Sequence, residues 1–136
     1  MNEVTKVPAA SFDDAFAHFS VLLSFETDCW DVHHALKLET PGFVLVDVRG
    51  EESYAEKHIP GAINILYRGI SKESLAFYPK ETLFVVYCSG PHCNAAIKSA
   101  IKLSDLKRPV KVMIGGIKGW QDEGFSFQMK YEETPF

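Results

Sequence analysis

Apolar residues recur along the chain in runs that are hydrophobic at both odd and even positions. The clearest runs are "PGFVLVDV" at 41–48, "TLFVVYC" at 82–88 and "PVKVMI" at 109–114, with the shorter "AINI" at 62–65. Polar and apolar residues alternate with helical spacing between these runs. Strands that are apolar on both faces and alternate with helices are typical of a parallel sheet covered on both sides. The pattern therefore predicts an α/β fold.

The helices between the strands are predicted from periodicity and from helix-starting and helix-stopping residues. They span 27–39, 51–58, 71–78, 94–106 and 115–124. In the 94–106 helix, Ile97, Ala100 and Ile101 share one face, which we expect to pack on the sheet. The last segment, 125–131, alternates apolar and polar residues and favours an edge strand or a packed tail.

A further helix is predicted at residues 11–26, with Ser11 as its N-cap and Asp14 as the capping-box partner. Large apolar side chains recur on one of its faces; they are Phe12, Phe16, Phe19 and Leu23. We expect this stripe to pack on the sheet of its own domain, and a partner or dimer surface is the alternative. The predicted organisation is a helical extension at 1–27 followed by one domain at 28–136.

Composition and charge narrow the possible partners. The chain has 136 residues, of which 46% are hydrophobic, and this suits a single domain with a full core. A formal net charge of −4 with dispersed positive residues argues against nucleic acid as a partner. No apolar run approaches the ~20 residues of a membrane span, and "MNEVTKVPAA" lacks the pattern of a signal peptide. We therefore expect a cytoplasmic protein without a nucleic-acid or membrane partner.

Three cysteines, an odd number, do not form a disulfide framework, and we expect them to stay free in a reducing setting. Cys29 shares a helical stripe with Val32 and Leu36, which predicts a small buried hydrophobic residue. The histidines and cysteines show no spacing typical of a metal site, so no metal is expected.

Cys88 stands where a buried strand ends and a helix is about to begin, in "FVVYCSGPHCNAA" at 84–96. Ligands of parallel sheets bind outside the carboxyl ends of the strands. Ser89 and Gly90 allow the backbone to curve, so that its N–H groups and the following helix can favour an anion. A thiol in such a place becomes a nucleophile more easily. A buried structural cysteine is the alternative.

Three separated stretches resemble the motifs of rhodanese-like domains. They are "LVDVRGEESYAEKHIPGAINI" at 45–65, "VVYC" at 85–88 with its short glycine-containing loop, and "MIGGIKGWQDEGF" at 113–125. The resemblance covers about residues 28–127. It implies a three-layer domain with a central parallel sheet of about five strands and helices on both faces.

The resemblance also implies a sulfurtransferase. Cys88 would accept sulfane sulfur, hold it as a persulfide and pass it to a thiophilic acceptor, with no cofactor besides this covalent intermediate. The implied partners are a small-molecule or protein sulfur donor and a thiol acceptor. Arg49 would brace the loop or hold an anionic donor, and Asp47 would be structural. Structural roles are also implied for a set of turn and packing residues, namely His58, Pro60, Gly61, Gly115, Gly116 and Trp120.

The loop of residues 88–93 departs from the family, because it carries His92 as its sole basic residue where Arg or Lys is common. Thiosulfate is therefore an uncertain donor. The residues expected to bind the donor are Arg49, Ser89, Gly90, His92, Cys93 and Asn94. His92 either promotes thiolate formation at Cys88 or is an exposed loop residue. Cys93 either resolves an oxidised or persulfidated Cys88 or is a small side chain under the helix start.

Three other functions remain open from the sequence. A phosphatase or arsenate reductase would need Cys-x5-Arg, whereas position 94 is Asn. A thiol redox sensor or relay would use Cys88 and Cys93. A non-catalytic rhodanese-like binding module would need no thiol at position 88. The identity of the donor and the acceptor and the oligomeric state are not determined by the sequence.

Overall fold

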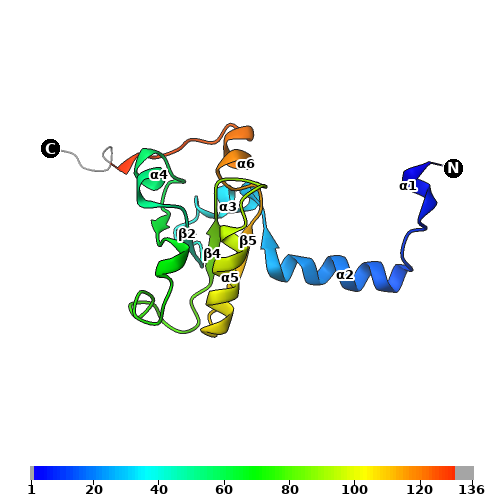
Figure 1. The fold of residues 1–136 in the computed structure, drawn as a ribbon, viewed down its shortest axis with the longest axis horizontal. Helices are drawn as coiled ribbons and strands as arrows, with labels where there is room; N and C mark the ends of the chain where they lie inside the picture. Colours follow the sequence, from blue (N-terminus) through cyan, green and yellow to red (C-terminus); the bar gives the residue numbers. More distant parts are fainter. Residues whose placement is uncertain (1, 131–136) are drawn as a thin grey trace.

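The computed structural model describes residues 2–130 and contains a five-stranded sheet with helices on both faces (Figure 1). The helices are α1 (Glu3–Lys6), α2 (Phe12–Phe25), α3 (Cys29–Ala35), α4 (Glu51–Glu56), α5 (Ala95–Asp105) and α6 (Gly116–Asp122), with a 3₁₀ turn η1 (Tyr67–Gly69). The strands are β1 (Glu26–Thr27), β2 (Val44–Asp47), β3 (Ile63–Asn64), β4 (Phe84–Tyr87) and β5 (Val110–Met113).

All strand pairs are parallel, and the order across the sheet is β1-β5-β4-β2-β3. The central strand β4 is buried at every position and pairs with β2 on one side and β5 on the other. This burial on both faces explains why its sequence is an uninterrupted apolar run. The predicted α/β fold with a parallel sheet is confirmed, and the sheet has the five strands that the resemblance implied.

The core consists of two apolar clusters, one on each face of the sheet. Alternate residues of β4 point to opposite faces, so Val85 and Tyr87 join the cluster that contains α3 and α6. Phe84, Val86 and the following Cys88 join the cluster beneath α5. The side chain of Cys88 therefore lies on the α5 face of the sheet.

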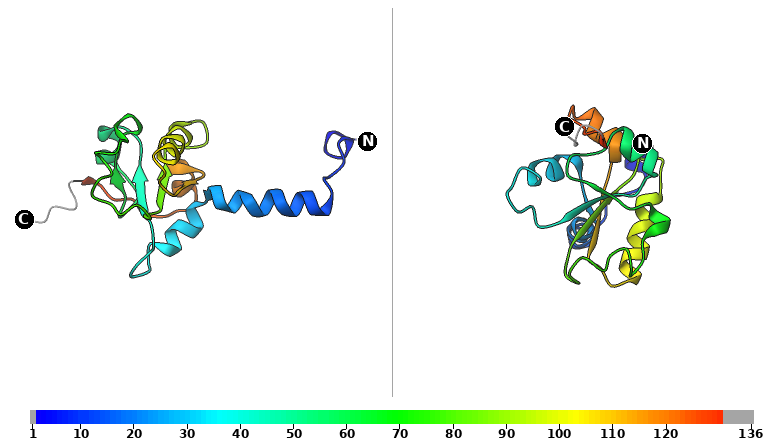
Figure 2. Two further views of the ribbon diagram at one scale, coloured as in Figure 1. Left: turned by 90° about the horizontal axis from the view of Figure 1, so that it is seen from below. Right: turned by 90° about the vertical axis from the view of Figure 1, so that its left-hand side faces the viewer.

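The helix predicted at 11–26 is present as α2, and the side chain of Ser11 caps it by accepting a hydrogen bond from the Asp14 N–H. The prediction that its stripe packs on the sheet is wrong. Phe12, Phe16 and Phe19 are 95%, 77% and 63% exposed, and α2 contains no buried residue. Figure 1 and the left-hand view of Figure 2 show α2 projecting away from the domain.

Three smaller expectations are also corrected. Residues 71–78 form turns and not a helix, although Leu75 is buried. The buried face of α5 is formed by Ala96, Ser99 and Leu103. Ile97 and Ile101, which we expected on that face, are exposed. Residues 125–130 form no strand in the described chain and contribute one isolated bridge, from Gln128 to His58; position 131 lies outside the described residues.

The sequence also did not predict β1. Its two residues pair with Val112 and Met113 of β5 and complete one edge of the sheet. This strand falls at the end of the predicted 1–27 extension, whose boundary at 27/28 remains a prediction. In the part of the chain that is described, no helix has the length and apolar content needed to cross a membrane.

Candidate functional site around Cys88

Cys88 lies directly after β4 at the carboxyl end of the sheet, as the apolar run predicted. Its side chain is 5% exposed and contacts the apolar cluster beneath α5. It also lines a cavity of about 280 Å³, together with Gly90, Pro91 and Cys93 from the loop and Met113 from β5. The sulfur is therefore largely shielded from water but borders an open space.

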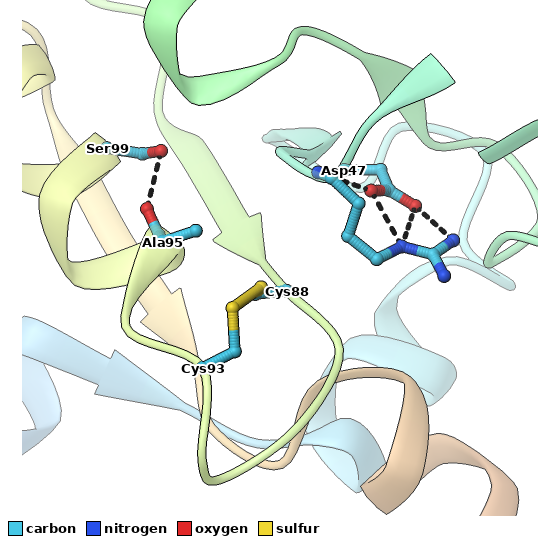
Figure 3. Close-up of a disulfide and its surroundings, with 6 residues drawn as sticks. Asp47, Cys88, Cys93, Ala95 and Ser99 are labelled. Carbon is cyan, nitrogen blue, oxygen red and sulfur yellow. Dashed lines mark hydrogen bonds and ion pairs between the residues drawn. A yellow bond between two sulfur atoms is a disulfide. The ribbon is translucent and has the colours of Figure 1, made fainter. Parts of the chain in front are cut away.

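Cys88 forms a disulfide with Cys93 across the loop (Figure 3). Their Cα atoms are 6.4 Å apart, within the 4.4–6.8 Å usual for disulfides. The N–H of Cys93 donates to the carbonyl of Gly90 at 3.1 Å, and this turn brings the chain back toward Cys88. The expectation that all thiols stay free is thus wrong for this pair, because the short loop closes on itself. Cys29 is free and buried, as predicted.

The loop rests on the N-terminus of α6. The N–H groups of Ile117 and Lys118 donate to the carbonyls of Cys88 and Ser89 at 3.0 and 2.9 Å. These two carbonyls are therefore committed to α6. The N–H groups of Gly90 and His92 donate to no protein group within residues 2–130.

Gly116 permits this close approach of α6 to the loop. Its φ is +57°, a conformation that favours glycine. A Cβ at this position would overlap the carbonyl oxygen of Cys88 and lie 3.0 Å from the nitrogen of Gly90. The second glycine of the "GG" in the 113–125 motif is thus explained by contact with the backbone of the thiol-bearing loop.

Lys118 supplies a positive charge next to the loop that sequence reasoning missed. It lines a hollow of about 430 Å³ with the loop residues, which are Ser89, Gly90, Pro91, His92 and Cys93. Its Nζ lies 2.6 Å from Asp122 Oδ1 in an exposed ion pair. The available signal was its place within the closing motif, two residues after Gly116, but the sequence does not show that this turn lies against the loop.

The structure does not bring Arg49 into contact with the loop. Its guanidinium forms a bidentate pair with Asp47, with Nε–Oδ1 at 3.0 Å and Nη2–Oδ2 at 2.8 Å. Nη2 also donates to the carbonyl of Lys57 at 2.6 Å. Asp47 lies to one side of the disulfide in Figure 3. Arg49 therefore braces the end of β2 and α4, and its role in donor binding remains a prediction.

The remaining predicted residues lie around the same loop. His92 is exposed, and Asn94 is the N-cap residue of α5 without a side-chain capping bond. Asp47 is fully buried and contributes, after burial itself, to raising the pKa of Tyr87, which therefore stays neutral. Within residues 2–130, no group of three or more His, Cys, Asp or Glu side chains is arranged to hold a metal.

Cys29 lies on the other face of the sheet from Cys88. Its Sγ is 3.6 Å from the carbonyl oxygen of Ile114 and 3.7 Å from that of Gly116. Burial, together with the charges of Asp28 and Glu123, raises the pKa of this thiol to about 11. Cys29 is therefore a poor nucleophile with a packing role.

Comparison with known proteins places the chain in a family. The sequence model of the rhodanese-like domain family matches residues 33–123. Over 112 residues the chain is 34% identical to an HTH-type transcriptional regulator of Mycobacterium tuberculosis, covering 82% of this chain and 49% of that protein. The chain thus spans about half the length of this curated relative.

Solved structures agree with this match. The BH2092 protein of Bacillus halodurans is 38% identical, with a TM-score of 0.84 over 88% of this chain and 87% of its own. A rhodanese-like domain protein of Staphylococcus aureus is 26% identical, with a TM-score of 0.60 over 78% of this chain and 98% of its own. A thiosulfate sulfurtransferase of Pseudomonas aeruginosa shares the fold at 18% identity, with a TM-score of 0.66 over 81% of this chain and 21% of its own. The chain belongs to the family of rhodanese-like domains.

Proposed function

We propose that the protein is a sulfurtransferase that carries sulfane sulfur as a persulfide on Cys88. The observation that supports this most directly is the position of Cys88, at the end of the central strand and on the wall of the loop cavity. Family membership supports the same class of chemistry. The uncommitted N–H groups of Gly90 and His92 are suited to the negative charge of a terminal sulfur.

The reaction has two steps. The Cys88 thiolate attacks the outer sulfur of the donor, a sulfur–sulfur bond forms at Cys88, and the bond between that sulfur and the donor breaks. The donor departs with the electron pair. An acceptor thiolate then attacks the outer sulfur of the persulfide, and Cys88 leaves as a thiolate. The Cys88–Cys93 disulfide has to be reduced before the first step, because a disulfide sulfur has no free thiolate.

The donor is expected to be anionic, because the ammonium group of Lys118 lines the hollow beside the loop. Mass spectrometry of the intact, reduced protein tests this proposal. Thiosulfate, mercaptopyruvate and glutathione persulfide are each added to Cys93→Ser, in which Cys88 is the remaining cysteine of the loop. The mass of one sulfur atom is expected on this variant but not on Cys88→Ser. If no donor adds sulfur at Cys88, the protein is not a sulfurtransferase.

A thiol redox relay is a second candidate, and the Cys88–Cys93 disulfide is the observation that favours it. In this function an oxidant converts the two thiols to the disulfide without a persulfide. Peroxide treatment of the reduced protein followed by peptide mapping would then give the 88–93 linkage. If Cys88 instead proceeds to sulfinic acid with Cys93 unlinked, this candidate is excluded.

A further inference from the structure

The loop places a second sulfur where it can react with a loaded Cys88. We propose that Cys93 discharges the Cys88 persulfide as hydrosulfide, so that the protein releases sulfide in addition to transferring sulfur. This inference rests on the proposed function. It is carried by the bonded position of the two sulfur atoms and by the 90–93 turn that holds Cys93 opposite Cys88.

The direction of attack follows from the geometry. Cys93 Sγ reaches the sulfur of Cys88 itself, which is the inner sulfur of the persulfide. The Cys93 thiolate forms the bond to this inner sulfur, and the bond from the inner to the outer sulfur breaks. The outer sulfur leaves with the electron pair as hydrosulfide. The sulfane sulfur is thereby reduced by two electrons, and the two cysteine sulfurs are oxidised to the disulfide. The proton that the Cys93 thiol loses is taken up by the departing sulfide.

The surroundings favour a reaction inside the loop over one with another thiol. Cys93 is half-buried and Cys88 is buried, so the two sulfurs meet in a space with limited access for water. Both cysteines are anchored, Cys88 by the bond from Ile117 N–H and Cys93 by the Gly90 turn and the start of α5. Such positioning makes an intramolecular thiol effective against acceptors in solution. Cys29, on the opposite face of the sheet, cannot substitute for Cys93.

The experiment uses the full chain, reduced, freed of reductant and kept anaerobic, with glutathione persulfide as the probe in equal amount. Intact mass and released sulfide are measured together. Wild type is expected to lose two hydrogen atoms in mass, form the 88–93 linkage and release sulfide in proportion to the disulfide. Cys93→Ser is expected to keep the added sulfur on Cys88 and to release sulfide at least roughly tenfold more slowly. Cys29→Ala serves as the matched control and should behave as wild type.

The outcomes separate this inference from the function on which it rests. If wild type keeps the sulfur as Cys93→Ser does, the sulfurtransferase stands and the discharge step is refuted. If wild type forms the disulfide without sulfide, Cys93 responds to oxidation alone and the inference also fails. If neither protein takes up sulfur, the proposed function itself is refuted.

A second inference comes from α2, whose exposed side chains are independent of the thiol site. The 14 residues of α2 extend about 21 Å, a length at which an isolated helix is marginal in water. Its stripe of Phe12, Phe16, Phe19 and Leu23 follows 4-3-4 spacing, the seam pattern of paired helices. An apolar helix of this kind is stable when another element covers it.

We infer that a second copy of this chain covers α2, with the two helices antiparallel about a twofold axis. A fully exposed side chain of this size offers about 200 Å², so the four side chains of the stripe together expose roughly 600 Å² per copy. This approaches the roughly 800 Å² per partner of a stable interface. A stripe that pairs with itself also meets the requirement of a twofold contact, in which both copies use the same surface.

A groove at the base of α2 extends the proposed interface. It has a volume of about 910 Å³, and its apolar lining includes Phe25, Ile97, Ile101 and Val112. Ile97 and Ile101 are 51% and 64% exposed. In an antiparallel pair, the first turn of one helix lies near the base of the other and therefore near this groove.

The charges of α2 favour the antiparallel arrangement. The first turn of α2 carries Asp13 and Asp14, and the helix has no Lys or Arg. The groove is lined by Lys107 and Arg108 and also by Glu26 and Asp105, so its charged side chains balance. An antiparallel pair keeps the two acidic first turns apart, whereas a parallel pair would place them side by side.

Light scattering coupled to size-exclusion chromatography tests this inference on the full chain at tens of micromolar. Wild type is expected at twice the monomer mass. Phe16→Asp should weaken the dimer by roughly 100-fold or more and elute as a monomer, because it buries a charge at the centre of the seam. Ala17→Asp adds the same charge away from the stripe and should remain dimeric. Ile101→Asp should also weaken the dimer, with circular dichroism confirming that each variant is folded. A monomeric wild type, or a Phe16→Asp variant as dimeric as wild type, overturns the inference.

Discussion

A methyl group added at Gly116 tests whether the contact between α6 and the loop positions Cys88. Gly116→Ala introduces two costs. An L-residue at φ +57° loses about 1–2 kcal/mol because of the left-handed conformation. The Cβ also overlaps the Cys88 carbonyl oxygen, so the loop or α6 has to move, which costs about 1–3 kcal/mol. The hydrogen bond from Ile117 N–H to that carbonyl would weaken as well.

Gly124→Ala is the matched control, because Gly124 has φ +78° but nothing within 4 Å of its Cβ position. It carries the conformational cost without the overlap. We expect Gly116→Ala to lower the free energy of unfolding by about 2–5 kcal/mol and Gly124→Ala by about 1–2 kcal/mol. For a domain of this size, this corresponds to falls in melting temperature of roughly 8–20 °C and roughly 4–8 °C.

Thermal and urea unfolding followed by circular dichroism measure these differences. Gly116→Ala should also load sulfur on Cys88 more slowly at a temperature where it is folded, whereas Gly124→Ala should load at the wild-type rate. If the two variants differ by less than about 0.5 kcal/mol, the overlap is relieved without strain. The loop would then not depend on α6, and this account of the "GG" motif would be incorrect.

Three further predictions concern side chains outside the disulfide. Arg49→Met should destabilise the domain by about 3–5 kcal/mol in urea unfolding, because it leaves the buried Asp47 carboxylate unpaired; a change below 1 kcal/mol would show that the pair is not needed. Lys118→Met should raise the KM for an anionic sulfur donor by roughly 3–10-fold with kcat nearly unchanged, since Lys118 would act through charge at an exposed position; an equal effect with an uncharged donor would contradict this. The Cys29 thiol has a pKa raised from 9.0 to about 11 in the folded state, so the stability it contributes is present below pH 9 and falls as pH rises toward 11. This loss should be at most about 2 kcal/mol in urea titrations and absent from Cys29→Ala, and a variant with the same pH dependence as wild type would assign the loss to other groups.

Local patterns in the sequence were sufficient to predict an element where one local interaction determines its structure. The runs at 41–48, 82–88 and 109–114 predicted the three longest strands, because a strand buried on both faces is apolar at nearly every position. The cap at Ser11 was predicted because an N-cap is a contact between residues three apart. The position of Cys88 at the carboxyl edge followed from the same strand pattern.

Predictions failed where contacts with residues distant in sequence override the local helical pattern. The 71–78 segment has helical periodicity, but Arg108 donates hydrogen bonds to the carbonyls of Leu75, Tyr78 and Pro79 and so holds them in a turn. On α5, Ala96, Ser99 and Leu103 face the sheet, since two small side chains let the helix approach closely and the Ser99 hydroxyl donates to its own helix at 2.8 Å.

For this protein, then, the sequence alone determined the class of fold, the family motifs and the candidate thiol, since each depends on neighbours along the chain. Only the tertiary structure decided that Cys93 reaches Cys88, that Lys118 borders the loop and that Arg49 turns toward Asp47. It also decided that the stripe of α2 is exposed, which no helical periodicity can reveal. The physical reason is that an apolar stripe or a reactive side chain specifies what kind of contact it needs, whereas its partner is selected by the packing of the whole chain.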